Sequence, residues 1–366
     1  MSQGTPTPTE SRDFAGELAQ RVAALSDSHA YGAYRTAREK VLRMKALEAE
    51  RLHGTEAPSE YWTEELLNIE YMLDASPLVI ERLRHHCFHI TGIRVYEYRS
   101  NRDKAKRMLE GKLRALQRVG APELLIPESR ELGGFGFEID GELYNVDTLK
   151  FYESLIALDR GGVLGDLRGG ERRVVWEIGA GWGGFAYQLK TVCPKVTYVI
   201  CDFAELFLFS ATYLMSMFPQ ARACFYGDED WRSAMSEADF VFIPHTALDE
   251  LRPDRLDLTV NTVSFQEMTG EQVEAYVRHA HRLGCDYLYS LNRDRSPYNT
   301  EITSVSELLG RWYWPHEVAV LPIPYTQMLD PDDVDHVTTT ARVTAKADGD
   351  YRHIVGWRRR ASAPAA

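Results

Sequence analysis

The spacing of apolar residues over positions 12–165 is that of helices. In 102–118 the apolar side chains recur three and four positions apart, on one face of a helix; they are Ala105, Met108, Leu109, Leu113 and Leu116. Residues 33–54 are rich in strong helix formers, and a serine followed by a proline predicts a helix over 77–89. We therefore predict a mainly helical region over 12–165.

Two local signals interrupt this helical region. Alternating apolar residues on either side of Asp140-Gly141 predict a short hairpin within 120–145. Asp147 is the predicted N-cap of a further helix over 148–160.

After residue 170 the pattern changes to short apolar runs that alternate with helical segments. The predicted strands are 174–178, 196–201, 240–243, 256–263, 286–291, 318–323 and 353–357. Strands that alternate with helices indicate a parallel sheet covered by helices on both faces. The last two runs are predicted to form an antiparallel pair at the sheet edge. The fold class is thus α/β, with a Rossmann-like, mostly parallel sheet over 166–360 behind the helical region.

Charge and hydropathy exclude several classes of protein. The 366 residues carry 42 Lys and Arg against 54 Asp and Glu, a net charge of −12, which argues against nucleic acid as the partner. No apolar run is long enough to span a membrane. The N-terminus lacks the pattern of a secretion signal, and the five cysteines are widely spaced. We expect a cytoplasmic protein with free thiols and with disordered ends at 1–11 and 361–366.

A glycine-rich segment, 174–184, carries the strongest local signal. A hydrophobic strand leads into Gly179, Gly181 and Gly183, and a helix follows. Glycines permit a tight turn and close approach of the backbone to a ligand, and the free N–H groups of the helix start attract negative groups.

Two cofactors suit this loop. Counted as G-x-G-x-x-G with Gly184, it would hold the pyrophosphate of a dinucleotide. Counted from Glu177, it suits S-adenosylmethionine, because a carboxylate attracts the ammonium of the methionine end and repels a pyrophosphate. Asp202 at the end of the next strand suits ribose hydroxyls in either case. Glu177 favours S-adenosylmethionine.

Five segments along the chain together form a recognisable pattern: WEIGAGWGGFA (176–186), VICDFAELF (199–207), FIP (242–244), DLTVNTVSFQEM (257–268) and YLYSLNRD (287–294). In these segments the chain resembles the sugar O-methyltransferase family within the class I S-adenosylmethionine-dependent methyltransferases. The resemblance implies a seven-stranded sheet, S-adenosylmethionine as the methyl donor and a glycosyl hydroxyl as the acceptor. The cofactor-binding residues are then Glu177, Gly179, Gly181, Gly183, Asp202 and Phe203.

The candidate catalytic residues follow other predicted strands. Glu267 is the first candidate for a general base or a cation ligand, and its alternative role is that of an acid at a helix start. His245 would contact the adenine, act as base or be structural. Asn292 is the third catalytic candidate, at the end of the fifth strand.

Two further residues are candidates for acceptor binding. Gln266 would hydrogen-bond a sugar hydroxyl or face solvent, and Asp294 would hold the acceptor or a metal or belong to an ordinary turn. Because Glu267, Asn292 and Asp294 all follow strands of one sheet, a divalent cation such as Mg²⁺ is a further expectation. No metal-ligand set is assigned.

The sequence predicts an S-adenosylmethionine-dependent methyltransferase that acts on a small-molecule or glycan acceptor, with the helical region as a cap over the strand ends. Two alternatives stay open: a nicotinamide-dependent oxidoreductase that uses the same loop, and a non-catalytic protein that binds S-adenosylmethionine. A homo-oligomer is compatible with the sequence, which predicts no oligomeric state.

Overall fold

The architecture is that of a computed structural model, which describes residues 13–49, 60–229, 231–295, 304–339 and 351–359. The ends predicted to be disordered lie outside these described residues. The helices are α1 (Phe14–Ser26), α2 (His29–Ala49), α3 (Glu60–Asn68), α4 (Pro77–Ile80), α5 (Leu83–His86), α6 (Phe88–Thr91), α7 (Asp103–Val119), α8 (Val146–Arg160), α9 (Val163–Leu167), α10 (Gly184–Val192), α11 (Phe207–Met217), α12 (Trp231–Ala234), α13 (Gly270–Arg282), α14 (Val305–Gly310) and α15 (Val334–Thr339).

The strands are β1 (Phe137–Ile139), β2 (Glu142–Tyr144), β3 (Val174–Ile178), β4 (Thr197–Asp202), β5 (Ala223–Phe225), β6 (Phe240–Pro244), β7 (Leu258–Thr262), β8 (Tyr287–Arg293), β9 (Tyr313–Glu317) and β10 (Tyr351–Arg358). In the described residues, β1 and β2 form the predicted hairpin, and the other strands form one sheet in the order β5-β6-β4-β3-β7-β8-β10-β9.

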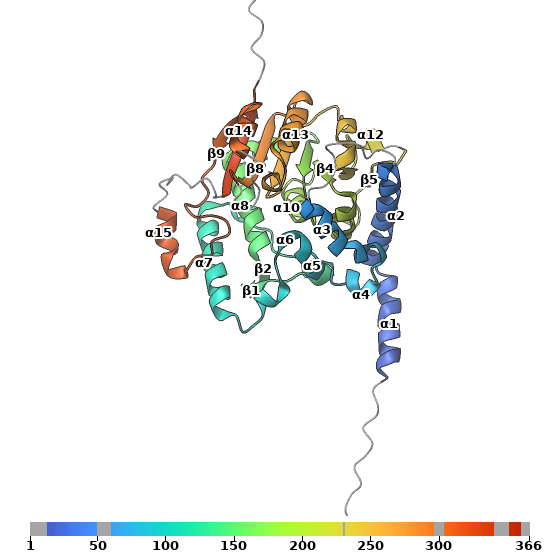
Figure 1. The fold of residues 1–366 in the computed structure, drawn as a ribbon. Coiled ribbons are helices and arrows are strands. Elements are labelled where there is room, and N and C mark those ends of the chain that lie inside the picture. Colours follow the sequence, from blue (N-terminus) through green and yellow to red (C-terminus); the bar gives the residue numbers. More distant parts are fainter. Residues whose placement is uncertain (1–12, 50–59, 230, 296–303, 340–350, 360–366) are drawn as a thin grey trace, which may run out of the picture.

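This sheet is mostly parallel with an antiparallel edge, as predicted. The strands from β5 to β8 pair in parallel, whereas β10 runs antiparallel to both β8 and β9. Every residue of β3 and β4 is buried, as is usual for strands covered by helices on both faces. Figure 1 shows helices flanking the sheet.

Two expectations about the sheet and its edges were wrong. The sheet has eight described strands instead of seven, because β5 pairs outside β6 at the edge. The partner of β10 is β9 rather than residues 318–323. β9 contains Pro315 and exposes most of its side chains, a composition tolerated at a sheet edge but without the apolar pattern of a strand.

Two expectations about helices were also wrong. The helix expected over 77–89 is broken into the one-turn helices α4, α5 and α6. The N-cap of α8 is Asn145, whose side chain forms a capping box with Thr148, because Asp147 is turned inward and bonds other side chains.

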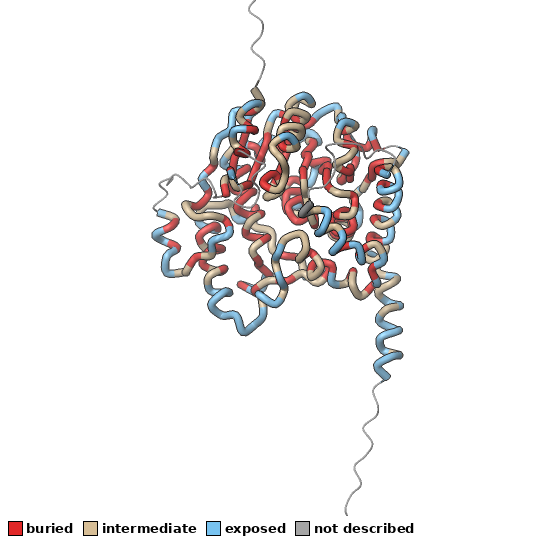
Figure 2. The backbone as a smooth tube through the Cα atoms, viewed as in Figure 1, coloured by how far each residue is buried: buried red, intermediate tan, exposed pale blue. Residues whose placement is uncertain are grey.

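The helical N-terminal region shares its core with the sheet. One buried hydrophobic cluster extends from Tyr34 on α2 to Val355 on β10, and α8 has buried residues along nearly its whole length. Figure 2 shows buried segments in both regions, while α1 projects from the body and is largely exposed. None of the described helices is both long and apolar enough to cross a membrane. The division of the chain at residue 165 stays a prediction.

Candidate active site at the carboxyl ends of the strands

Strand order reverses at β3, whose neighbours are β4 on one side and β7 on the other. In open α/β sheets, the crevice at such a switch point is where ligands bind. A cavity of about 660 Å³ lies there. Its lining includes Gly179 after β3, Asp202 at the end of β4, His245 after β6 and Glu267 after β7. Phe203 lines it as well, so the tertiary structure brings five of the predicted site residues to one cavity.

The glycine loop requires glycine for conformational and steric reasons. Gly179, Gly181 and Gly183 have φ angles of 70°, 58° and 83°, in the left-handed region that other residues rarely adopt. A Cβ atom on Gly179 would lie 2.3 Å from the Ser264 hydroxyl oxygen, and one on Gly181 would lie 2.8 Å from a methyl carbon of Ile90. The loop therefore packs tightly against the turn that follows β7 and against α6.

Asp202 binds the glycine loop. Its carboxylate accepts hydrogen bonds from the backbone N–H groups of Gly181 and Phe203, both at 2.8 Å. Burial raises the pKa of this carboxyl to about 7, although these backbone donors lower it. Each carboxylate oxygen can accept more than one hydrogen bond, so Asp202 retains acceptor capacity at the cavity wall.

Glu177 lies on β3, two residues before Gly179, and is fully buried. One carboxylate oxygen accepts a hydrogen bond of 2.9 Å from the Tyr198 hydroxyl. The other oxygen is buried and has no hydrogen-bond partner among the described residues. Burial raises the pKa of Glu177 to about 8, nearby Asp202 raises it further, and Lys150 opposes the shift. A buried carboxylate oxygen without a donor suits a cationic donor group from a ligand.

Aromatic rings form another part of the cavity wall. The ring of Phe203 lies 5.4 Å from that of Trp62 and 4.7 Å from that of His245, as measured between centroids. All three residues line the cavity. Such a wall suits a flat, partly apolar ligand ring. Trp62 comes from α3, so the helical region contributes directly to the site.

Glu267, the first candidate for the general base, lines the cavity. Its carboxylate accepts a hydrogen bond of 3.2 Å from the indole N–H of Trp62. Burial raises the pKa of Glu267 to about 7, Asp202 adds to the increase, and Lys150 and the Trp62 hydrogen bond lower it. A carboxyl group with a pKa near neutrality is suited to general base catalysis.

Three other candidates, Asn292 for catalysis and Gln266 and Asp294 for acceptor binding, do not line the cavity. Gln266 donates to the Tyr351 hydroxyl at 3.3 Å and accepts from the backbone N–H of Arg293 at 3.0 Å. Asn292 donates to Asn261 and Ser290, both at 2.8 Å. These side chains connect strands and turns inside the sheet.

Asp294 holds the start of α14. It accepts hydrogen bonds from the Ser304 hydroxyl at 3.0 Å and from the backbone N–H of Ser306 at 2.8 Å. The described residues contain no group of three or more His, Cys, Asp or Glu side chains that could hold a metal ion. The expected divalent cation is therefore not supported, since Asn292 and Asp294 are engaged away from Glu267.

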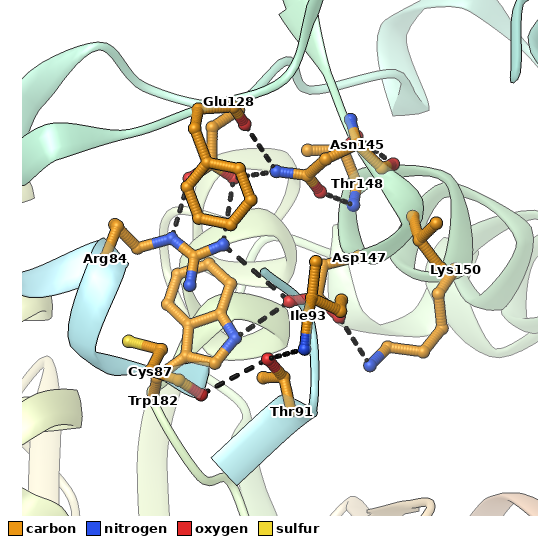
Figure 3. A network of polar contacts seen from close by, with 12 residues as sticks. Arg84, Cys87, Thr91, Ile93, Glu128, Asn145, Asp147, Thr148, Lys150 and Trp182 are labelled. Atoms are coloured by element: carbon orange, nitrogen blue, oxygen red, sulfur yellow. Dashed lines mark hydrogen bonds and ion pairs between the residues drawn. The ribbon is translucent and has the colours of Figure 1, made fainter. Parts of the chain in front are cut away.

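A buried ionic network ties the helical region to the glycine loop (Figure 3). The Arg84 guanidinium on α5 lies 3.4 Å from the ring centroid of Trp182, which stands between Gly181 and Gly183. The Trp182 indole N–H donates to Asp147 at 3.2 Å, and Lys150 donates to the other oxygen of Asp147 at 2.8 Å.

The same guanidinium donates to Glu128 at 2.6 Å, and Arg84 and Glu128 are both buried. Burial and the surrounding carboxylates act in opposite directions on Arg84, and its pKa stays above its usual range. Arg84, Trp62 and Ile90 were not predicted as site residues, because they belong to no motif. The signal for this network was Trp182, since a tryptophan inside a glycine-rich turn indicates that another side chain packs on it.

Comparisons with known proteins yield structural similarity at low identity. No protein-family model matches the chain, and no curated protein matches it. Precorrin-6y C5,15-methyltransferase from Geobacter metallireducens is similar with 16% identity over 55% of this chain and 87% of that one, at a TM-score of 0.33. Magnesium protoporphyrin IX methyltransferase from Synechocystis PCC 6803 has 13% identity over 59% of this chain and 85% of that one, at a TM-score of 0.34.

The phosphoethanolamine N-methyltransferase 2 of Haemonchus contortus has 10% identity over 59% of each chain, at a TM-score of 0.36. The names of these three proteins describe methyl transfer to different acceptors. At such identities, the chemistry of this chain follows from its own site.

Proposed function

We propose that this chain is an S-adenosylmethionine-dependent O-methyltransferase that acts on a hydroxyl group of a sugar or a glycosylated metabolite. The observation that carries the proposal is the buried oxygen of Glu177 without a described donor, next to a glycine loop. The ammonium group of a methionine moiety satisfies such an oxygen, whereas a dinucleotide pyrophosphate would be repelled by it.

The chain's own residues would hold the cofactor at three points. Glu177 binds its ammonium, the remaining acceptor capacity of Asp202 takes the ribose hydroxyls, and the rings of Phe203 and His245 cover the adenine. When bound, S-adenosylmethionine supplies an electrophilic methyl group on a positively charged sulfur. The protein's main contribution is orientation, worth up to roughly 7–11 kcal/mol in well-aligned reactions.

Glu267 is the proposed general base. A sugar hydroxyl is a weak nucleophile, and a carboxylate within reach of its proton raises its reactivity as the new bond forms. The lining position of Glu267 and its pKa near 7 support this role. Trp62 orients the carboxylate through its indole N–H.

A sugar acceptor is supported by two features. The segment 257–268, which ends one residue after Glu267, resembles the corresponding segment of sugar O-methyltransferases. The cavity also offers the aromatic faces of Trp62 and Tyr276, and flat rings cover the apolar face of a pyranose.

Calorimetric titration tests the cofactor, with S-adenosylhomocysteine and NADH as the two ligands. We expect S-adenosylhomocysteine to bind and NADH to give no heat. Binding of NADH alone would replace the proposal by the nicotinamide-dependent oxidoreductase, whose loop pattern Gly179, Gly181 and Gly184 also satisfy. Binding of S-adenosylhomocysteine without transfer to any glycoside would favour the non-catalytic alternative.

A further inference from the structure

The cavity is strongly unbalanced in charge. Its lining holds five carboxylate side chains, Asp202, Asp249, Glu267, Glu271 and Glu274, and the single guanidinium of Arg278. The cavity is a site on independent grounds, because the glycine loop and the ends of four strands converge there. With every carboxyl group of the lining ionised, the excess is four negative charges, and this excess bears on what the site accepts.

The donor accounts for only part of this charge. S-adenosylmethionine carries a sulfonium, an ammonium and a carboxylate, a net charge of +1. We assign its ammonium to Glu177, which lies outside the lining, has an unpartnered buried oxygen and adds one negative charge to the site. Counting Glu177 and the Arg311 that pairs with Glu274, three negative charges remain in excess when the donor is in place.

Two of the lining carboxylates are exposed and have no cationic partner among the described residues. Asp249 belongs to the 3-10 helix His245–Glu250 that follows β6, and Glu271 to the first turn of α13. Both are exposed and both line the cavity, so they lie where an acceptor enters from solvent. Glu274, by contrast, forms an ion pair with Arg311.

We infer that the acceptor is a sugar that carries a protonated amino group, and that the site discriminates against phosphorylated and nucleotide-linked sugars. This inference rests on the proposed methyltransferase function and narrows its acceptor. A phosphate group beside Asp249, Glu271 and Glu267 would be repelled by all three carboxylates, whereas an ammonium group is attracted by each. The amino group is recognised and a hydroxyl is methylated.

The transfer step is the same for every acceptor. A lone pair of the sugar hydroxyl oxygen forms the new O–C bond, and the electron pair of the C–S bond returns to sulfur, which becomes a neutral thioether. The hydroxyl proton passes to the carboxylate of Glu267. The ammonium of the acceptor takes no part, since its nitrogen has no lone pair.

A matched series of glycosides tests this inference. Transfer from S-adenosylmethionine is measured by mass spectrometry for methyl glucoside, its 2-amino-2-deoxy and 6-amino-6-deoxy derivatives, and its 6-phosphate. We expect the better amino derivative to exceed the phosphate by about tenfold or more in kcat/KM, which corresponds to about 1.4 kcal/mol. Because exposed charges are screened, raising the salt concentration to about 0.5 M should reduce this ratio.

Variants assign the preference to the cavity. Glu271→Gln and Asp249→Asn should each lower the ratio of amino to phosphate acceptor by about twofold to fivefold. Asp254→Asn is the matched control, because it removes an exposed carboxylate that lies outside the cavity lining, and it should retain the ratio.

Equal or faster transfer to the phosphate would overturn the inference while leaving the methyltransferase function intact. So would methylation of the amine nitrogen, which fragmentation of the product distinguishes from methylation of oxygen. Failure of all four glycosides, with S-adenosylhomocysteine still bound, would instead overturn the sugar methyltransferase function on which the inference rests.

Discussion

Two parts of one sheet edge carry similar polar residues with different roles. At the ends of β3, β4 and the turn after β7, Glu177, Asp202 and Glu267 are buried or half-buried carboxyl groups that keep free acceptor capacity. At the end of β8, Asn292 and Asp294 are equally buried, yet their side chains are bonded to Asn261, Ser290, Ser304 and Ser306. A polar residue at a strand end is therefore available to a ligand only when the protein has not already satisfied it.

The largest expected effect is on catalysis by Glu267→Gln. Loss of the general base should lower kcat by about 10²- to 10⁴-fold, while the affinity for S-adenosylhomocysteine changes little. Since the base acts in its ionised form, kcat of the unmodified protein should rise with pH through about 7. The variant should lack that rise. Retention of more than half of the activity would show that Glu267, in the turn after β7, is not the general base.

The variant Glu177→Gln tests the residue assigned to the cofactor's ammonium, and the quantity measured is the free energy of unfolding. The pKa of Glu177 is raised to about 8 in the folded protein, so between pH 4.5 and 8 the folded state binds more protons than the unfolded state. Its contribution to the free energy of unfolding should therefore fall as pH rises through this window, on the order of a few kcal/mol in total.

Chemical denaturation at several pH values measures that loss. The difference between Glu177→Gln and the unmodified protein should grow with pH in favour of the variant, and saturating S-adenosylhomocysteine should reduce the growth. A difference independent of pH would contradict a buried, unpaired Glu177.

Asp202→Asn should weaken binding of S-adenosylhomocysteine by roughly 10- to 150-fold, because hydrogen bonds to a charged group contribute about 1.5–3 kcal/mol. The substitution preserves the shape of the side chain, so calorimetric affinity separates it from a folding defect. Unchanged affinity would remove Asp202 from the cofactor site.

The smallest effect is expected from Asp294→Asn, which serves as the matched control for Asp202→Asn. Weakening the hydrogen bonds to Ser304 and Ser306 should lower the free energy of unfolding by about 1 kcal/mol. The affinity for S-adenosylhomocysteine and kcat should stay within about twofold. A large loss of activity would show that the end of β8 belongs to the site after all.

The regular spacing of apolar residues made much of the fold predictable from the sequence. The parallel strands β3, β4, β6, β7 and β8 are buried apolar runs, and the glycines after β3 mark a turn that only glycine tolerates. β9 was missed because an exposed edge strand with Pro315 has no apolar pattern. β5 was not predicted because a strand of three residues is too short to show a recognisable pattern of apolar positions.

The site was predictable only where one local segment determines it. These local signals lie within about 25 residues of sequence. They are the spacing of the glycines, Glu177 on β3 and Asp202 at the end of β4. By itself, the sequence thus determined the α/β class, the glycine turn and the acids around it. Only the tertiary structure decided that Trp62 bonds Glu267, that Arg84 stacks on Trp182, and that Asn292 and Asp294 are satisfied elsewhere. Those contacts join residues far apart in the chain, and no local pattern encodes which distant partner satisfies a buried polar group.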